Sequence, residues 1–430
     1  MYDVLVLTLL IFMIVALVIG KPERHWVGLI LFIILLLSGA LSIDESIKYI
    51  SWDVLGLIIC MSIYTSFLEN SGGAHWIAEY LLKKINEPKL LSFLLILLSG
   101  IISIALDNVT VVLIFAPIAF KLIEKTRIDP IALLIGVTLA ANMSGSATMI
   151  GDPPAMLVAS HYDLTFMDFI FYNGKPSMFF ITLIPMIIST YVYTELTIKK
   201  NNELIIPRKS SEKEALTYMD KAFVYEALLF LSIQIILLSI RNIIHISLTQ
   251  AALINISGLS LTRILLHRDY DSVKESIVKG FEWKTILFLI GVFTLSGAFA
   301  KHGLALRLAE AILSTGRDIY VVSTILIWLS VGISAVLDNI PYVATMLPVI
   351  DELAIRLNTD PLSIAWALLL GATLGGGITY IGATANVVGV RLLEKKGYRV
   401  TFYEFIKKSL PFNLVNVLSG WFIYWLFWLL

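Results

Sequence analysis

The sequence predicts an all-α polytopic membrane protein, built as two inverted repeats with a polar site between them. Three observations predict it: long uncharged apolar runs, a repeat of uncommon residue pairs, and two Asp-Asn pairs embedded in apolar sequence. The chain has 430 residues, of which 58% are hydrophobic and 15% charged, whereas soluble proteins carry about 25% charged residues. The formal net charge is zero, so no nucleic-acid partner is indicated.

The apolar runs have the length and pattern of membrane-spanning helices. Residues 4–20, 27–42 and 178–194 could each cross a hydrocarbon core of ~30 Å as a helix. They do not alternate polar and apolar residues as the strands of a membrane barrel do. The first run lacks a basic start and a small-residue cleavage site, so we expect a membrane helix rather than a signal peptide. Cys60, the single cysteine, excludes an intramolecular disulfide.

A polar segment divides the chain into two related halves. Residues 199–221 lose the apolar pattern, which predicts a solvated linker between residues 1–198 and 222–430. The halves align at an offset of 231 residues, and the alignment pairs uncommon residue types. The clearest pairs are Leu106-Asp107-Asn108 with Leu337-Asp338-Asn339, Asp129-Pro130 with Asp360-Pro361, and Ile150-Gly151 with Ile381-Gly382.

Each half is predicted to contain three spanning helices, a hairpin that enters and leaves by one face, a broken helix and a last spanning helix. In the first half these cover residues 3–20, 27–42, 53–69, 89–126 (hairpin), 130–160 (broken helix) and 176–198. In the second half they cover 222–240, 246–262, 284–300, 319–357 (hairpin), 361–391 (broken helix) and 411–429. Five crossings per half insert the halves with opposite orientation, as in many secondary transporters. Most Lys and Arg residues then fall on the linker side, which predicts a cell-membrane protein with a cytoplasmic linker and both termini outside.

The two hairpin turns carry the first set of candidate site residues. Asp107-Asn108 and Asp338-Asn339 lie at turns between arms too short to span the membrane alone. A carboxylate at membrane depth is costly and indicates a functional site. Helix capping is the alternative, because Asp or Asn at a turn accepts hydrogen bonds from the next helix. The two roles are compatible, since a cap directs a helix N-terminus at whatever binds there.

The broken helices carry the second set. The segments ANMSGSATMIGDPPA and LGGGITYIGATAN are rich in Gly, Ser and Thr, and Pro153-Pro154 prevent continuous helical hydrogen bonding. Unwound backbone at membrane depth persists only where it is buried in protein or lines a wet cavity. Its carbonyls and hydroxyls could coordinate a cation or a small oxyacid, whereas close packing of small residues is the alternative. The candidate hydroxyls belong to Ser144, Ser146, Thr148, Thr379 and Thr384.

These segments resemble the ion-transporter superfamily. The motifs LDNVTVVLIFAPI, ANMSGSATMIGDPPA, LDNIPYVATMLPV and GATAN are most similar to the branch holding arsenite permeases (ArsB), NhaD sodium/proton antiporters and the melanosomal P protein. The resemblance covers nearly the whole chain and implies an elevator-like homodimer, in which hairpins and broken helices move against a scaffold of the other helices. It implies a binding site formed by Asp107, Asn108, Ser144, Gly145, Thr148, Asp152, Asp338, Asn339, Thr379, Thr384 and Asn386.

The sequence departs from the family pattern in two places. The family's DPPN appears as Asp152-Pro153-Pro154-Ala155, and its GGNGT as Gly375-Gly376-Gly377-Ile378-Thr379. Each change removes an amide side chain. The substrate therefore does not carry over from any one branch.

The chemistry of the two turns limits which solutes and coupling ions the site could bind. Two carboxylates disfavour a dianion and favour protons, sodium or a neutral solute. Burial and like charge favour the protonated form of at least one carboxyl group, which can then carry a proton between faces. We expect no Lys or Arg at membrane depth to anchor an anion. One cysteine excludes a multi-thiolate arsenic site, so hydroxyls and carboxylates would have to hold arsenite, which is a neutral trihydroxide at neutral pH.

These points predict a secondary transporter that exports arsenite or a similar small metalloid, driven by proton entry. The alternatives are a Na⁺/H⁺ antiporter using the same carboxylates and an anion transporter like the P protein. No cofactor is expected, other than a Na⁺ ion that Asp107, Asn108, Asp338 and Asn339 could hold. The sequence lacks the GxGD motif of intramembrane aspartyl proteases, an HExxH motif and a Walker loop, so no enzyme activity is expected.

Overall fold

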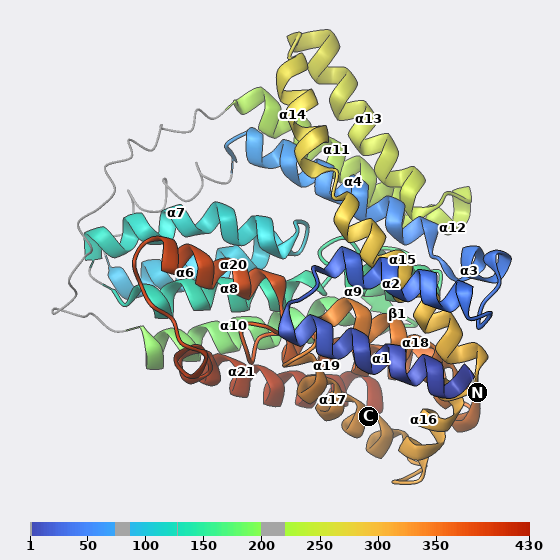
Figure 1. Cartoon of the computed structure of the whole chain (residues 1–430). Coiled ribbons are helices and arrows are strands. Elements are labelled where there is room, and N and C mark those ends of the chain that lie inside the picture. Colours follow the sequence, from blue (N-terminus) through green and yellow to red (C-terminus); the bar gives the residue numbers. More distant parts are fainter. Residues whose placement is uncertain (1, 74–86, 127, 199–219) are drawn as a thin grey trace.

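A computed structural model describes residues 2–73, 87–126, 128–198 and 220–430 (Figure 1). Most of the predicted linker, residues 199–219, lies outside the described residues. The described residues form helices and loops, apart from a two-residue antiparallel pair of β1 (Phe171–Tyr172) and β2 (Lys175–Pro176). Within this part of the chain, six helical stretches are long and apolar enough to cross a membrane. The all-α membrane fold predicted from the sequence is confirmed.

In the first half, two of the described helices begin at residues with a clear local cause. Its helices are α1 (Tyr2–Ile19), α2 (Arg24–Leu37), α3 (Ile43–Tyr49), α4 (Trp52–Asn70), α6 (Pro88–Ser103), α7 (Asn108–Thr126), α8 (Pro130–Gly145), α9 (Pro153–His161), a 3₁₀ turn (Met167–Phe169) and α10 (Met178–Thr197). Asp129 and Asp152 accept backbone N–H groups at the starts of α8 and α9, each followed by proline.

The second half follows the same order. Its helices are α11 (Lys221–Ser239), α12 (Arg241–Ile244), α13 (Leu248–His267), α14 (Tyr270–Gly280), α15 (Trp283–Lys301), α16 (Leu304–Leu313), α17 (Ile319–Ser334), α18 (Asn339–Leu357), α19 (Pro361–Gly375), α20 (Thr384–Lys395), α21 (Phe402–Tyr424) and a final π-helical turn (Trp425–Leu429). The last helix begins at Phe402 rather than at 411, because Thr401 caps it and Pro411 is tolerated inside it.

The helices form two groups that meet around the site. In one group α4 packs on α13 and α14, at the upper end in Figure 1, and α2 packs along α15. The α2–α15 contact is a close backbone approach, because a Cβ on Gly28 would lie 2.4 Å from the Cα of Phe288. In the other group α6 packs on α8, α17 on α19, and α10 on α21.

The two halves interlock within the second group. The helix α7 of the first half packs against α20 of the second half, and α18 of the second half packs against α9 of the first. Each hairpin is therefore completed by the broken helix of the other half. This arrangement brings the breaks between α6 and α7, α8 and α9, α17 and α18, and α19 and α20 into one region.

Candidate functional site

The breaks between the helices line a cavity of about 720 Å³. Six of the predicted site residues line it: Asp107, Asn108, Asp152, Asp338, Asn339 and Thr384. The opposite wall comes from the loop between α1 and α2, from α4 and from α15. The structure thus brings both hairpin turns and both broken helices to one cavity.

The two hairpin aspartates cap the helices that follow them. Asp107 Oδ2 accepts hydrogen bonds from the backbone N–H groups of Val109 (3.0 Å) and Thr110 (3.1 Å). Asp338 Oδ1 accepts one from the N–H of Ile340 at 3.2 Å, and its side chain is only 7% exposed. Both aspartates therefore cap a helix, and this capping also directs both carboxyl groups into the cavity.

The neighbouring asparagines are held in the same way in both halves. Ser103 Oγ donates to Asn108 Oδ1 at 2.7 Å, and Ser334 Oγ donates to Asn339 Oδ1. These serines stand at equivalent positions of the sequence repeat. Sequence reasoning missed both, although a serine four residues before each aspartate was a visible signal.

Glycine is required where each broken helix passes a hairpin turn. A Cβ on Gly145 would lie 2.5 Å from Asn108 Oδ1 and 3.0 Å from Asp152 Cβ. A Cβ on Gly376 would lie 2.9 Å from Asn339 Oδ1. The absence of a side chain at Gly145 therefore allows the first hairpin turn to approach the broken helix closely.

Asp152 lies at the centre of a buried polar network. Its side chain is 3% exposed, and Oδ2 accepts a hydrogen bond from Ser146 Oγ at 2.8 Å. The Ser146 hydroxyl also lies 2.7 Å from Thr373 Oγ1, and Asn142 Nδ2 donates to the Thr373 carbonyl at 3.1 Å. The sequence analysis did not single out Asn142 or Thr373, although polar residues in apolar helices were a signal.

Backbone carbonyls gather behind each hairpin turn. The position of a Cβ on Gly151 lies within 3 Å of the carbonyl oxygens of Gly145, Ser103 and Ile104. The equivalent position on Gly382 lies 2.7 Å from the carbonyl oxygen of Ser334 and 3.0 Å from that of Gly376. Unwound carbonyls of this kind coordinate Na⁺ in other transporters.

Five predicted site residues are not on the cavity wall. They are Ser144, Gly145, Thr148, Thr379 and Asn386, and all of them are buried. The hydroxyls of Thr148 and Thr379 donate to the carbonyls of Ile104 and Ala335, and Asn386 Nδ2 donates to the carbonyls of Gly376 (2.9 Å) and Thr379 (3.2 Å). They support the hairpin turns and the second broken helix. The Ser144 hydroxyl lies beside Gly100, in the contact between α6 and α8.

An arginine enters the cavity, against our expectation that no basic side chain would do so. Arg24 Nη1 lies 2.8 Å from Asp338 Oδ2 and 2.9 Å from Thr384 Oγ1. Arg24 is the first residue of α2, and 43% of its side chain is exposed. The expectation was wrong because a long side chain at a helix end can reach several ångströms toward the membrane interior.

Other charges surround the mouth of the cavity. Glu23 pairs with Lys284 at 2.9 Å, and Glu282 and Arg391 also line the opening. No group of three or more His, Cys, Asp or Glu side chains arranged to hold a metal ion occurs among the described residues. The oxygen atoms available to a cation therefore come from single carboxyl groups, hydroxyls, amides and carbonyls.

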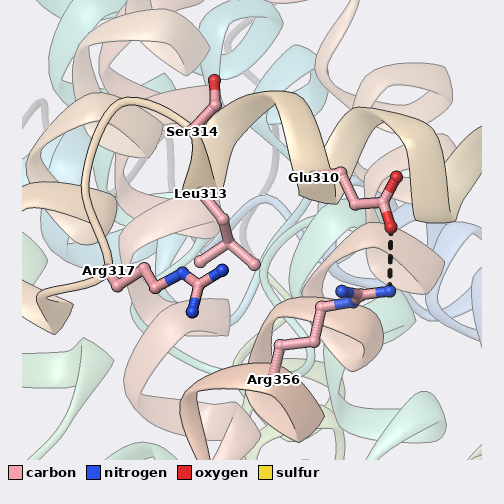
Figure 2. A pocket seen from close by; sticks show the side chains of 5 residues that line it. All are labelled: Glu310, Leu313, Ser314, Arg317 and Arg356. Carbon is pink, nitrogen blue, oxygen red and sulfur yellow. Dashed lines mark hydrogen bonds and ion pairs between the residues drawn. The ribbon is translucent and has the colours of Figure 1, made fainter.

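A second hollow, of about 590 Å³, lies beside α16 and contains none of the predicted site residues (Figure 2). Its lining includes Glu310, which pairs with Arg356 at 3.0 Å, and the side chain of Arg317 (Figure 2). It shares no lining residue with the cavity at the helix breaks, so it is a separate hollow.

Comparison with known proteins identifies the family. The model of the citrate transporter family (CitMHS) matches residues 14–371 of the chain. The chain belongs to the citrate transporter family. An uncharacterized transporter of Mycobacterium tuberculosis is 30% identical over 381 residues, which cover 88% of this chain and 86% of the relative. The P protein of Mus musculus is 25% identical over 461 residues, covering 88% of this chain and 54% of that protein.

A solved structure shares the fold. The YdaH transporter of Alcanivorax borkumensis superposes with a TM-score of 0.64 at 15% sequence identity, covering 94% of this chain and 98% of that one. As a member of the citrate transporter family, the protein is a membrane transporter and not an enzyme. The resemblance to the ion-transporter superfamily, including the P protein, is confirmed.

Proposed function

We propose that this citrate transporter family member is a secondary active transporter that couples solute movement to proton movement through Asp107, Asp152 and Asp338. The observation that carries the proposal is that these three carboxyl groups line one cavity at the helix breaks. A carboxylate inside a membrane protein is costly unless a proton or a cation neutralises it. Among the described residues, Asp338 has a basic partner, whereas the recorded partners of Asp107 and Asp152 are hydroxyl and backbone N–H groups.

The repeat supports an alternating-access mechanism. Asn142 contacts Thr373, and these residues occupy equivalent positions in the two halves. A residue can contact its own counterpart only near the axis that relates the halves, so this axis would pass beside the cavity. We propose inverted halves with a cytoplasmic linker, both termini outside the cell, and an elevator-like movement of the hairpins and broken helices in a homodimer.

For the solute, we propose arsenite or a similar small metalloid, exported as protons enter. A neutral trihydroxide can donate hydrogen bonds to Asp107 and Asp152 without needing a fixed cation. Cys60 is buried in α4 and does not line the cavity, so oxygen atoms rather than thiolates would hold the solute.

Two observations favour other solutes. The carbonyl groups around Gly151 and Gly382 favour sodium as substrate or coupling ion, as in a Na⁺/H⁺ antiporter. Arg24 favours an anion such as citrate, because a guanidinium group in the cavity can bind a carboxylate.

Flux measurements in proteoliposomes test these proposals. The purified protein is reconstituted, a pH gradient is imposed, and arsenite, Na⁺ or citrate is added while internal pH and solute uptake are followed. The substrate is the solute whose movement dissipates the gradient. We expect Asp107→Asn, Asp152→Asn and Asp338→Asn each to abolish coupled flux, because an amide cannot bind and release a proton.

The same variants must still fold. An asparagine oxygen can still accept the capping N–H group, so each variant should elute as the wild-type oligomer and retain its melting temperature within a few degrees. Asp318→Asn is the matched control, because Asp318 caps α17 through the N–H of Tyr320 (2.7 Å) and does not line the cavity. Normal proton-coupled flux in all three cavity variants would refute the proton-carrier role.

A further inference from the structure

We propose that Arg24 is a built-in competitor of the coupling cation: it neutralises Asp338 while the carrier is empty and must be displaced before a cation binds there. This inference rests on the proposed function, because it assigns a further role at the same site. It makes Arg24 a positioning residue that ties the second hairpin to α2 until the cation arrives.

The contact joins the two helix groups directly. One guanidinium nitrogen of Arg24 lies within hydrogen-bond distance of both Asp338 Oδ2 (2.8 Å) and Thr384 Oγ1 (2.9 Å). Thr384 Oγ1 itself donates to Asp338 Oδ2 at 3.3 Å. Arg24 therefore holds the turn of the second hairpin and the first residue of α20 at the same time.

The backbone of Arg24 is fixed, whereas its side chain is partly exposed. It begins α2, which is fixed on α15 through the close backbone contact at Gly28. Asp338 is 7% exposed, but Arg24 is 43% exposed. The guanidinium group can consequently turn into the water of the cavity at little cost, whereas the carboxylate cannot leave its place.

The first half has no equivalent arrangement. Asp107, the counterpart of Asp338, accepts hydrogen bonds from Val109 and Thr110, with no basic partner among the described residues. The second-half counterpart of α2 is α13, which begins at Leu248 instead of an arginine, and the N–H of Leu248 is bound by Asp53. The two hairpins are thus electrostatically different, although their sequences repeat.

A competing arginine has a consequence for coupling. Asp338 Oδ2 cannot bind a proton or a sodium ion strongly while it shares a hydrogen bond with Arg24. If the hairpins move against α2 and α15, the ion pair must break during each cycle, and the coupling cation supplies the replacement charge. The empty carrier would therefore be held in place, which limits uncoupled movement.

The test separates the affinity for the cation from the affinity for the solute. In the proteoliposome assay, Arg24→Gln should lower the half-saturating concentration of the coupling cation about tenfold. For protons, the midpoint of the pH profile should move about one unit to higher pH. The half-saturating solute concentration should stay within twofold of wild type. Glu23, Glu282, Lys284 and Arg391 also surround the opening of the cavity. All variants keep these four residues and are measured over the same pH range, so differences between variants do not come from them.

Matched variants complete the experiment. Arg24→Lys keeps a cation but loses the planar group that reaches two acceptors, so an intermediate shift is expected. Arg307→Gln removes an arginine from another ion pair, Arg307–Asp3 (3.1 Å), which does not line the cavity, and should behave as wild type. If Arg24→Gln does not fold, Thr384→Val must shift the cation dependence in the same direction by two- to threefold.

Three results would overturn the inference. Identical cation dependence in Arg24→Gln and Arg307→Gln would show that Arg24 does not compete. A higher half-saturating solute concentration with an unchanged cation dependence would show that Arg24 binds an anionic solute instead. A shift in Thr384→Val toward weaker cation binding would also contradict it. Failure of the wild-type protein to give any gradient-driven flux would refute the proposed function itself.

Discussion

The contact between Gly145 and Asn108 gives the most direct test of the site geometry. In Gly145→Ala, the new Cβ would lie 2.5 Å from Asn108 Oδ1, 3.0 Å from Asn108 Nδ2 and 3.0 Å from Asp152 Cβ. The asparagine oxygen would have to retreat by roughly 1 Å, and such overpacking typically costs 1–3 kcal/mol. The asparagine cannot retreat freely, because Ser103 holds Oδ1 at 2.7 Å.

This strain should reduce transport more than it reduces folding. A cost of about 1–3 kcal/mol lowers the population of the correct hairpin geometry roughly 5- to 150-fold. We expect the initial rate of gradient-driven uptake to fall at least about fivefold in Gly145→Ala, as measured in proteoliposomes. The rest of the helix contacts remain, so the variant should still be purified as a folded protein.

Gly332→Ala provides the control for a glycine-to-alanine change in a helix. Gly332 lies in α17, and a Cβ there would meet no atom within 4 Å. The control should be as active as wild type and slightly more stable, by about 0.5–1 kcal/mol. If Gly145→Ala transports as fast as Gly332→Ala, the close contact at the first hairpin has no functional role and the reasoning fails.

Two further predictions follow from the same structure. Gly376→Ala should impair uptake less than Gly145→Ala, because its nearest atom, Asn339 Oδ1, would be 2.9 Å away, and equal losses would contradict this order. Arg263→Gln should lower thermal stability by about 1–3 kcal/mol at neutral pH, because it leaves the partly exposed carboxylates of Asp220, Glu226 and Asp269 without their buried cation. Burial opposes ionisation of Asp220, but backbone N–H groups and the Arg263 guanidinium outweigh it and lower its pKa below the usual 3.8. The pKa of Asp269 is lowered in the same way. This stabilisation is thus present above pH 3.8 and is lost as pH falls through the lowered pKa values. The melting temperatures of wild type and variant should therefore converge as the pH falls below 3.8, and a constant difference would refute the prediction.

The helix breaks were predictable because they rest on local chemistry. Asp107-Asn108 and Asp338-Asn339 interrupt apolar sequence, and α7 and α18 begin at these pairs. Pro153 likewise marks the start of α9. The sequence predicts that the last helix begins at residue 411, whereas α21 begins at Phe402 and runs through Pro411. Neighbouring helices tolerate proline inside a membrane helix, and a single sequence does not show those neighbours.

The long-range contacts of the site were not predictable. Arg24 and Asp338 are 314 residues apart, and nothing in the pattern around Arg24 distinguishes it from an ordinary interfacial arginine. Ser144 shows the reverse case: the sequence predicts it as a site residue because it shares a polar segment with Asp152, but it does not line the cavity. On a helix, neighbouring positions face different directions, and the Ser144 hydroxyl faces α6 instead.

The interlocked packing of the halves also has a consequence for biosynthesis. The surface of α7 is covered by α20, which begins at Thr384, near the end of the chain. At ordinary rates of translation, the interval between the two helices is on the order of tens of seconds. During that time the ribosome-bound intermediate holds α7 without α20, so the insertion machinery or lipid must cover this surface of α7 until the last helices emerge.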